Sequence, residues 1–230
     1  WSMGHGRAPT RAVQRLKRMT GAKPTFARRE KIALGMFLVW ALGASLSSTL
    51  GLWLAIGSTA VFLGVVASYL EGRALIASLR FEPAPLAIGA VVGLGMIVAT
   101  KLIFTPLAVA LPALVSETRE LYGAFGEIGP WAPFVLLPLV VAGEEIVWRG
   151  LVYNALSRRM KWTSVVLVGT ALYCLAHAPV GSPVLVLACL CVGICWNALR
   201  YWTDSLAAVF VAHMLWDISI LILWPLVAFD

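Results

Sequence analysis

The chain has 230 residues, of which 60% are hydrophobic and only 13% are charged, and its mean hydropathy is +0.88. This composition excludes an ordinary soluble domain, in which about a quarter of the residues are charged. The net charge is +7, and half of the 18 Lys and Arg residues lie in the first 31 positions, directly before a long apolar run. This distribution is typical of a basic segment that contacts anionic lipid headgroups beside a membrane. It argues against nucleic acid as a partner.

Several apolar runs are long enough to cross a hydrocarbon core, which requires about 20 residues per helix. The run 32–70 is long enough for two spans, with a polar break at Ser47–Gly51. Pro106–Val115 is apolar but short, so it is expected to form either a re-entrant segment or an eighth helix. We predict an all-α, polytopic transmembrane helical bundle of seven to eight spans. The seven expected helices are 32–48, 51–70, 84–105, 131–156, 163–179, 184–200 and 205–228.

The remaining basic residues indicate the orientation in the membrane. Most of them follow the second, fourth and sixth predicted spans, and these loops share one side if the spans alternate. The opposite loops are neutral or acidic, and the segment 116–130 is the most acidic of them. Positively charged loops are retained in the cytoplasm. We therefore expect an integral multi-pass protein with a cytoplasmic N-terminus.

Three charged residues, Glu144, Glu145 and Arg149, lie inside the predicted span 131–156. An ionisable side chain at the centre of a membrane helix costs several kcal/mol on insertion scales (roughly 2.5–3.5), so such residues indicate a functional site with a nearby partner. Glu145 and Arg149 are four residues apart and are expected to pair on one helix face. Glu144 points about 100° away from Glu145. It needs a different partner.

Two histidines are embedded in later spans, and a carboxylate follows the second one. With about 1.5 Å of rise per residue, His177 and His213 can reach the depth of Glu144 near the middle of the membrane. Asp217 lies four residues after His213 and can orient its imidazole. These residues together could activate a water molecule. The same residue types also occur in proton-coupled transporters and in non-catalytic membrane scaffolds or immunity factors, so both alternatives stay open.

Three motifs in this region resemble those of one protease family. Glu144–Gly150 (EEIVWRG) resembles the EExxxR motif of the CPBP intramembrane proteases, the CAAX protease and bacteriocin-processing (Abi) family. Tyr173–His177 (YCLAH) is similar to the second motif of that family, and His213–Asp217 (HMLWD) is similar to the last one. The motifs occur in the order of the family, and the resemblance covers about 131–228.

The resemblance implies a role for each of these residues. Glu144 and His177 would hold and deprotonate the attacking water, and His213 would donate to the oxyanion of the tetrahedral intermediate. Position 217 is Asp here, where Asn is frequent in the family. An ionised carboxylate only accepts hydrogen bonds, so Asp217 is expected to keep His213 protonated. The resemblance also implies that Glu145 and Arg149 support the site. Arg149 is further implied as a contact for a substrate carboxylate.

The function implied by the resemblance is that of an intramembrane endopeptidase. It would cleave a membrane protein or peptide close to a C-terminal segment of that substrate, which is either embedded in the membrane or anchored to it by a lipid. The resemblance favours a glutamate-activated water without a cofactor, but Glu144, His177 and His213 could also supply three zinc ligands. The expected organisation is a basic segment at 1–31, N-terminal helices and an outer loop at 32–130, and catalytic helices at 131–230. Short loops and many small residues favour a bacterial cytoplasmic membrane.

Overall fold

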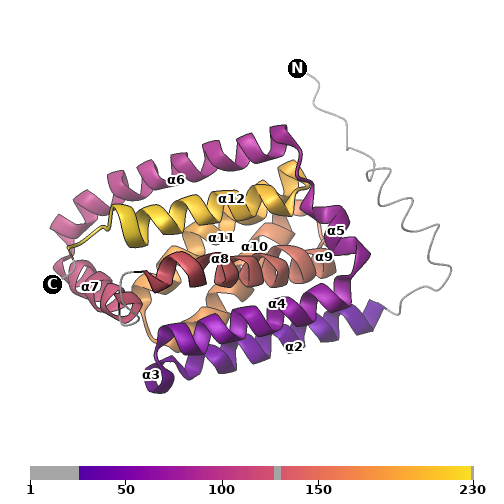
Figure 1. Ribbon diagram of the computed structural model, residues 1–230, viewed down its shortest axis with the longest axis horizontal. Helices are drawn as coiled ribbons and strands as arrows, with labels where there is room; N and C mark the ends of the chain where they lie inside the picture. The colour runs from indigo at the N-terminus through magenta and orange to yellow at the C-terminus, as the bar shows by residue number, and fades with distance from the viewer. Residues whose placement is uncertain (1–25, 127–130, 229–230) are drawn as a thin grey trace.

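The computed structural model describes residues 26–126 and 131–228, and in these ranges the chain is a bundle of helices without strands (Figure 1). The prediction of an all-α bundle is therefore confirmed. The part of the basic segment at 1–25 lies outside the described residues. The elements are α2 (Phe26–Ser45), α3 (Ser47–Leu50), η1 (Trp53–Gly57), α4 (Ser58–Glu71), α5 (Arg73–Leu79), α6 (Pro83–Ala110), α7 (Pro112–Gly126), α8 (Ala132–Glu145), η2 (Ile146–Val152), α9 (Tyr153–Leu156), α10 (Trp162–His177), η3 (Ala178–Val180), α11 (Pro183–Thr203), α12 (Leu206–Asp217) and η4 (Ile218–Leu223).

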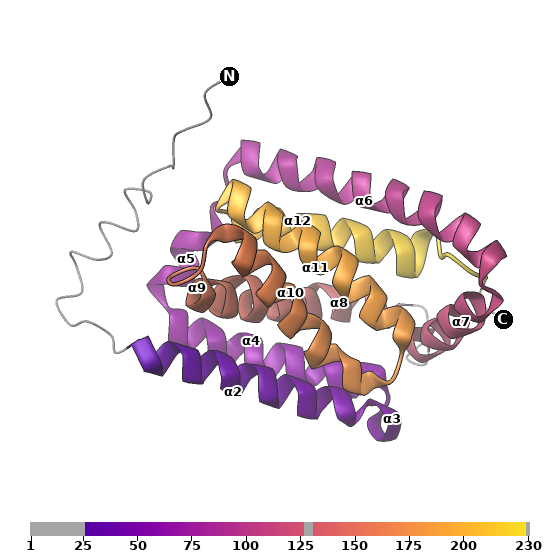
Figure 2. The ribbon, with the colours of Figure 1, turned by 180° about the vertical axis from the view of Figure 1, so that it is seen from behind.

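Five of the described helices are long and apolar enough to cross a membrane: Trp53–Glu71, Pro83–Ala110, Trp162–Val180, Pro183–Thr203 and Leu206–Leu223. Two more of the expected spans, α2 and the rod formed by α8, η2 and α9, pack against these helices in the same bundle (Figure 2). Both contain charged residues, at the start of α2 and at the junction of α8 with η2. The protein is an integral membrane protein, and length and composition support five of its seven expected spans.

The prediction for Pro106–Val115 is wrong in its boundaries. α6 continues through Pro106 to Ala110, since membrane helices tolerate an internal proline. The break comes at Leu111, which has φ −132° and ψ 81°. A residue that precedes proline is disfavoured in the helical region, and Pro112 then begins α7, where its missing N–H is not needed.

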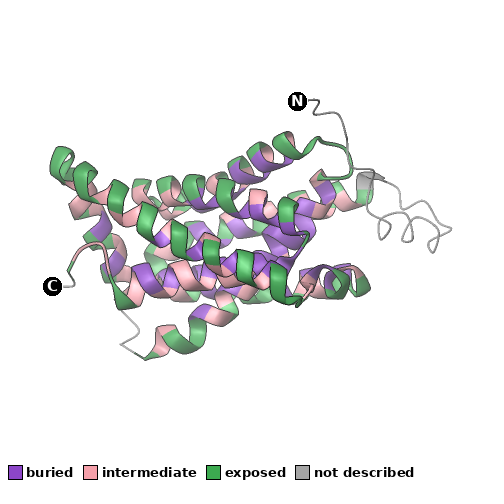
Figure 3. Cartoon of the chain, turned by 90° about the horizontal axis from the view of Figure 1, so that it is seen from above, coloured by how far each residue is buried: buried purple, intermediate pink, exposed green. Residues whose placement is uncertain are grey.

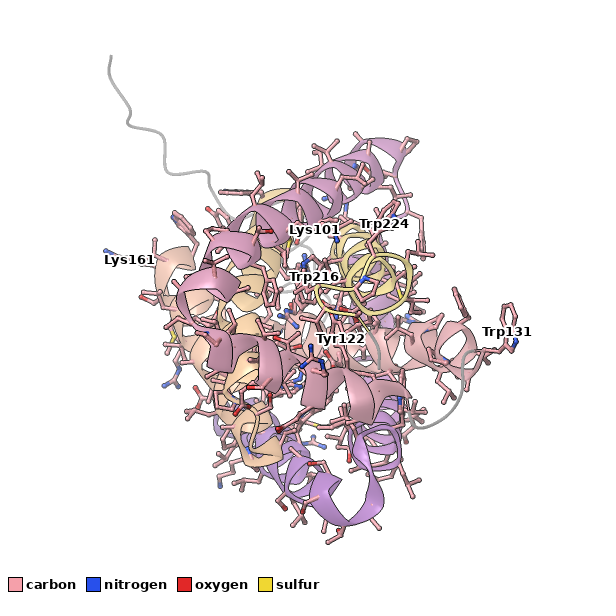
Figure 4. The ribbon with its side chains drawn as sticks, turned by 90° about the vertical axis from the view of Figure 1, so that its left-hand side faces the viewer. Lys101, Tyr122, Trp131, Lys161, Trp216 and Trp224 are labelled. Carbon is pink, nitrogen blue, oxygen red and sulfur yellow. The ribbon has the colours of Figure 1, made fainter. Side chains whose placement is uncertain are left out.

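The acidic segment, expected to be a loop, is largely the helix α7. Thr118 and Tyr122 are one turn apart and buried. The Tyr122 hydroxyl donates to the Ile220 carbonyl at 2.7 Å and accepts from the Leu226 N–H at 3.2 Å. Tyr122 is labelled on α7 in Figure 4. Burial raises the pKa of Tyr122 to about 12, so the hydroxyl keeps its proton at neutral pH. α7 therefore closes one end of the bundle against the C-terminal segment. The polar residues on its exposed face are the reason that the sequence predicts a loop here.

The outer surface of the bundle is apolar and the polar residues are gathered inside. Many exposed residues lie along the outer helices in the view of Figure 3, and on α6 the exposed residues include Val91, Leu94 and Leu102, which are 56–70% exposed. Lipid tails satisfy such a surface, because they are as apolar as these side chains. The charged and polar residues at the centre are then buried among helices. Each needs a partner there.

Glycines allow two pairs of helices to approach closely. A Cβ on Gly143 of α8 would lie 2.2 Å from the Ala60 carbonyl oxygen of α4, and one on Gly64 would lie 2.6 Å from the Gly143 Cα. In the same way, a Cβ on Gly89 of α6 would lie 2.3 Å from the Ala208 carbonyl oxygen of α12. Small residues at such contacts drive helix packing in membranes. The first contact lies beside the buried charges, since Gly143 directly precedes Glu144.

We expect Gly143→Ala to destabilise the protein by about 1–3 kcal/mol, the usual effect of overpacking a close contact. The added methyl meets backbone atoms of α4, so the two helices must separate. Thermal unfolding of the purified protein in detergent measures the effect. Gly95→Ala is the matched control, because a Cβ at Gly95 meets nothing within 4 Å. Equal unfolding temperatures for the two variants would contradict the close packing of α4 on α8.

Candidate active site

The three charged residues of the fourth predicted span lie where α8 passes into the π-helical segment η2. Glu144 is 7% exposed, Glu145 1% and Arg149 0%. π-Helical segments are rare and occur frequently at functional sites. Here the segment follows Glu145 directly and carries Arg149. Buried charges of this kind require compensation from neighbouring side chains.

Glu145 is shared between two cations. Its Oε1 accepts a hydrogen bond from Arg149 Nη1 at 3.2 Å, which is the expected pair on one helix face. The same oxygen lies 2.8 Å from His213 Nδ1 of α12. Among the described residues, Glu145 Oε2 and Arg149 Nε and Nη2 have no hydrogen-bond partner. Glu145 thus joins α8 and η2 to α12.

Arg149 is enclosed by aromatic rings. Its guanidinium carbon lies 4.4 Å from the ring centroid of Tyr173 and 5.0 Å from that of Trp196. A guanidinium over an aromatic face is stabilised by the negative potential of the ring, and more so when both are desolvated. Arg149 has no exposed surface, and it contacts Glu145 and these two rings.

Glu144 is held by residues of α10. Its Oε2 accepts a hydrogen bond from the Tyr173 hydroxyl at 2.8 Å, and its Oε1 lies 3.7 Å from His177 Nε2. The second distance is too long for a direct hydrogen bond. The structure therefore brings Glu144 and His177 together, and it leaves Glu144 Oε1 facing the imidazole.

The hydrogen bonds of His177 define its tautomer. His177 Nδ1 lies 2.8 Å from the Tyr173 carbonyl oxygen, which only accepts, so Nδ1 carries the proton. His177 Nε2 lies 3.2 Å from the indole Nε1 of Trp40 on α2, which only donates, so Nε2 is the acceptor. His177 is therefore assigned as the neutral imidazole with its proton on Nδ1.

His213 lies between two carboxylates. Its Nδ1 faces Glu145 Oε1 at 2.8 Å, and its Nε2 faces Asp217 Oδ2 at 3.2 Å. Carboxylates accept hydrogen bonds, so the ring satisfies both contacts by carrying both protons. The ring also stacks on Trp196, with centroids 3.8 Å apart and an interplanar angle of 26°. The orienting contact with Asp217 is present as expected, and Glu145 is a second partner that the sequence did not indicate.

The arrangement of these side chains does not fit a zinc ion. A zinc ligand must offer a free lone pair, but His177 Nε2 accepts from Trp40 and both nitrogens of His213 face carboxylates. No group of three His, Cys, Asp or Glu residues in the described part of the chain is arranged to hold a metal ion. Glu144, His177 and His213 therefore do not form a common ligand set in this arrangement.

Sequence reasoning gave no role to three aromatic residues that shape the site. Tyr173 was noted as part of a motif, but its hydroxyl on Glu144 was not expected. Trp196 was not noted at all. Trp40 was also missed, although it lies near the middle of an apolar helix, whereas membrane tryptophans are enriched at the two interfaces. Its place inside an apolar run is the one feature of the sequence that indicates a special role for Trp40.

A pocket of about 180 Å³ opens at the end of the bundle where α2 begins and α4 ends. Glu71 accepts hydrogen bonds there from Arg29 at 3.3 Å and from Asn154 at 3.1 Å. None of the six predicted site residues lines it. The lining residues are Arg28, Arg29, Ile32, Leu70, Glu71 and Leu151.

Comparison with known families assigns the region that carries this site. Residues 127–219 match the family model described as Type II CAAX prenyl endopeptidase Rce1-like. Over this segment, the chain is similar to the type II CAAX prenyl endopeptidases. The searches of curated proteins and of solved structures gave no match. The resemblance of the three motifs is thereby confirmed, and the family identifies this membrane protein as a protease.

The buried Arg149 of this CAAX protease relative should matter far more for stability than a surface arginine. We expect Arg149→Leu to lower the free energy of unfolding by about 3–5 kcal/mol, because it leaves the Glu145 charge short of a partner inside the bundle. Arg159→Leu is the control, since Arg159 pairs with Glu30 at 3.5 Å with 58% of its side chain exposed. Exposed pairs contribute about 0–1 kcal/mol. Denaturant unfolding in detergent compares the two, and equal losses would refute the central role of Arg149.

Proposed function

We propose that this protein is an intramembrane endopeptidase in which Glu144 activates the attacking water. The observation that carries the proposal is the pairing of Glu144 with His177 inside an otherwise apolar bundle. One carboxylate oxygen is held by Tyr173 at 2.8 Å, and the other faces the imidazole at 3.7 Å. An embedded carboxylate positioned in this way is suited to general-base catalysis. The match to a family of endopeptidases supports the same chemistry.

In the proposed reaction, a water molecule lies beside Glu144 Oε1, with His177 bordering it on the other side. Glu144 accepts a proton from the water while the oxygen attacks the carbonyl carbon of the scissile peptide bond. The carbonyl π-bond opens and gives a tetrahedral intermediate with a negative oxygen. When the C–N bond breaks, Glu144 returns its proton to the leaving nitrogen. A single carboxylate thus serves as base and then as acid.

His213 is proposed to stabilise the negative oxygen of the intermediate. Its two ring protons lie between Glu145 and Asp217, and the contact with Asp217 is the longer at 3.2 Å against 2.8 Å. The Nε2–H is therefore the weaker-bound donor and the one that an oxyanion can share. Asp217 and Glu145 keep the ring protonated and oriented. Stabilisation by such a preorganised donor is a major contribution to acyl-transfer catalysis.

The substrate is proposed to be a membrane protein or peptide, cleaved near a membrane-embedded or lipid-anchored C-terminal segment. The apolar surface of the bundle and the buried site support this class, because a soluble substrate has no route to Glu144 through lipid. The pocket lined by Arg28 and Arg29 lies at the end of the bundle where α2 begins. It supports contact with anionic lipid headgroups at that end. The basic loops favour a cytoplasmic location for that end, in a bacterial membrane. Reporter fusions to the two termini test this orientation.

We expect Glu144→Gln to reduce the rate of peptide-bond cleavage by about 10²–10⁴-fold, the usual contribution of a general base. The assay uses proteoliposomes and lipid-anchored peptides that vary in their C-terminal segment. Glu82→Gln is the matched control, because Glu82 is an exposed carboxylate that pairs with Arg80 at the bundle end. Full cleavage by Glu144→Gln would refute the proposal. A biological phenotype that survives Glu144→Gln would favour the scaffold or immunity alternative.

The proposed reaction uses no metal, so prolonged incubation with a chelator should leave the cleavage rate unchanged. The reason is that neither histidine offers a free lone pair to a metal ion. Trp40 donates to His177 Nε2, and both nitrogens of His213 carry protons that face carboxylates. The measurement compares chelated enzyme before and after addition of zinc. Loss of activity followed by recovery with zinc would replace this mechanism by one in which Glu144, His177 and His213 bind the ion.

A further inference from the structure

Trp40 contributes a hydrogen bond to the proposed catalytic pair from the N-terminal helices. It lies on α2, whereas the family match begins at residue 127. Its side chain is 0% exposed, and its Nε1 lies 3.2 Å from His177 Nε2. The helix α2 packs against α10, which carries His177. The sequence 127–219 alone therefore does not supply all the contacts of the site.

The side chains around this contact are buried. The Trp40 ring meets the Trp148 ring edge-on at 5.4 Å between centroids, and it lies 5.4 Å from the His177 ring. The ring of Tyr173 also packs against the imidazole of His177, with 4.4 Å between the ring centroids. All four side chains are less than 5% exposed. A hydrogen bond in such a buried environment is stronger than one in water.

The bond between Trp40 and His177 limits what the imidazole can do. A neutral imidazole has one lone pair, here on Nε2, and the indole N–H occupies it. The ring can then neither accept a proton from water nor donate one to Glu144. Without the indole N–H, Nε2 could take up a proton and donate it to Glu144 Oε1, which lies only 3.7 Å away. That contact would occupy the oxygen that the attacking water needs.

We propose that Trp40 is a positioning residue for catalysis, which keeps His177 as the neutral Nδ1–H tautomer and so leaves Glu144 as the only proton acceptor of the pair. This inference rests on the proposed protease function. It assigns a role to α2 that the family match does not cover.

The direct test is the ¹⁵N spectrum of histidine-labelled protein, since the chain has only three histidines. The His177 signals are those that vanish in His177→Ala. In the unchanged protein we expect one protonated and one unprotonated nitrogen for His177. In Trp40→Phe, which keeps a ring and removes the N–H, we expect Nε2 to become protonated. Trp148→Phe is the matched control, because the Trp148 Nε1 has no hydrogen-bond partner among the described residues.

Kinetics provide the second readout. Trp40 acts on the reaction through His177, so Trp40→Phe should lower kcat by about tenfold, the order of one buried hydrogen bond, and change KM by less than about twofold. Trp148→Phe should leave both within about twofold. A merely structural role for Trp40 would lower the folded fraction without changing the His177 tautomer.

The outcomes separate this inference from the proposed function. If Trp40→Phe and Trp148→Phe give the same ¹⁵N spectrum and the same kcat, the inference is overturned while the protease function stands. If the unchanged protein cleaves no substrate, the protease function fails, and the ¹⁵N comparison still decides whether Trp40 sets the tautomer. If Trp40→Phe does not fold, the spectrum of the unchanged protein decides, since a protonated Nε2 on His177 overturns the inference.

Discussion

The site depends on the Glu145 carboxylate, which contacts two cations at the centre of a bundle that faces lipid on its outside. Arg149 and His213 approach the same oxygen at 3.2 Å and 2.8 Å. Removal of any of the three would leave an uncompensated charge in a medium that cannot solvate it. This interaction joins η2 to α12 and orients His213, whose other ring nitrogen faces Asp217 of the same helix. The rest of the proposed chemistry requires that orientation.

Two adjacent glutamates acquire different roles because their neighbours differ. Glu145 is 1% exposed and is bound to cations, whereas Glu144 contacts the neutral groups Tyr173 and His177. The Glu145 oxygen that faces Arg149 and His213 is already engaged by two cations. The carboxylate beside a neutral imidazole keeps an oxygen for chemistry. Neighbouring positions on a helix point about 100° apart, and this rotation alone delivers them to different partners.

The N-terminal helices contribute to the site even though the family match does not include them. α4 packs against α8 through Gly64 and Gly143, one residue before Glu144. α2 places Trp40 on His177. The helices around the family segment therefore set both the position of the carboxylate and the hydrogen bonding of the imidazole.

The sequence by itself determined the all-α membrane class, most helix positions and the pairing of Glu145 with Arg149, because these follow from hydropathy and helical periodicity along one segment. It also selected Glu144, His177, His213 and Asp217, since charges in apolar runs are conspicuous. It erred at Pro106–Val115 and in treating most of 116–130 as a loop, where local proline geometry and burial of Tyr122 prevailed. Only the tertiary structure decided the contact of His213 with Glu145, the hydroxyl of Tyr173 on Glu144 and the indole of Trp40 on His177. Such contacts join residues 29 to 137 positions apart, and their geometry depends on how helices rotate and pack, which no local pattern encodes.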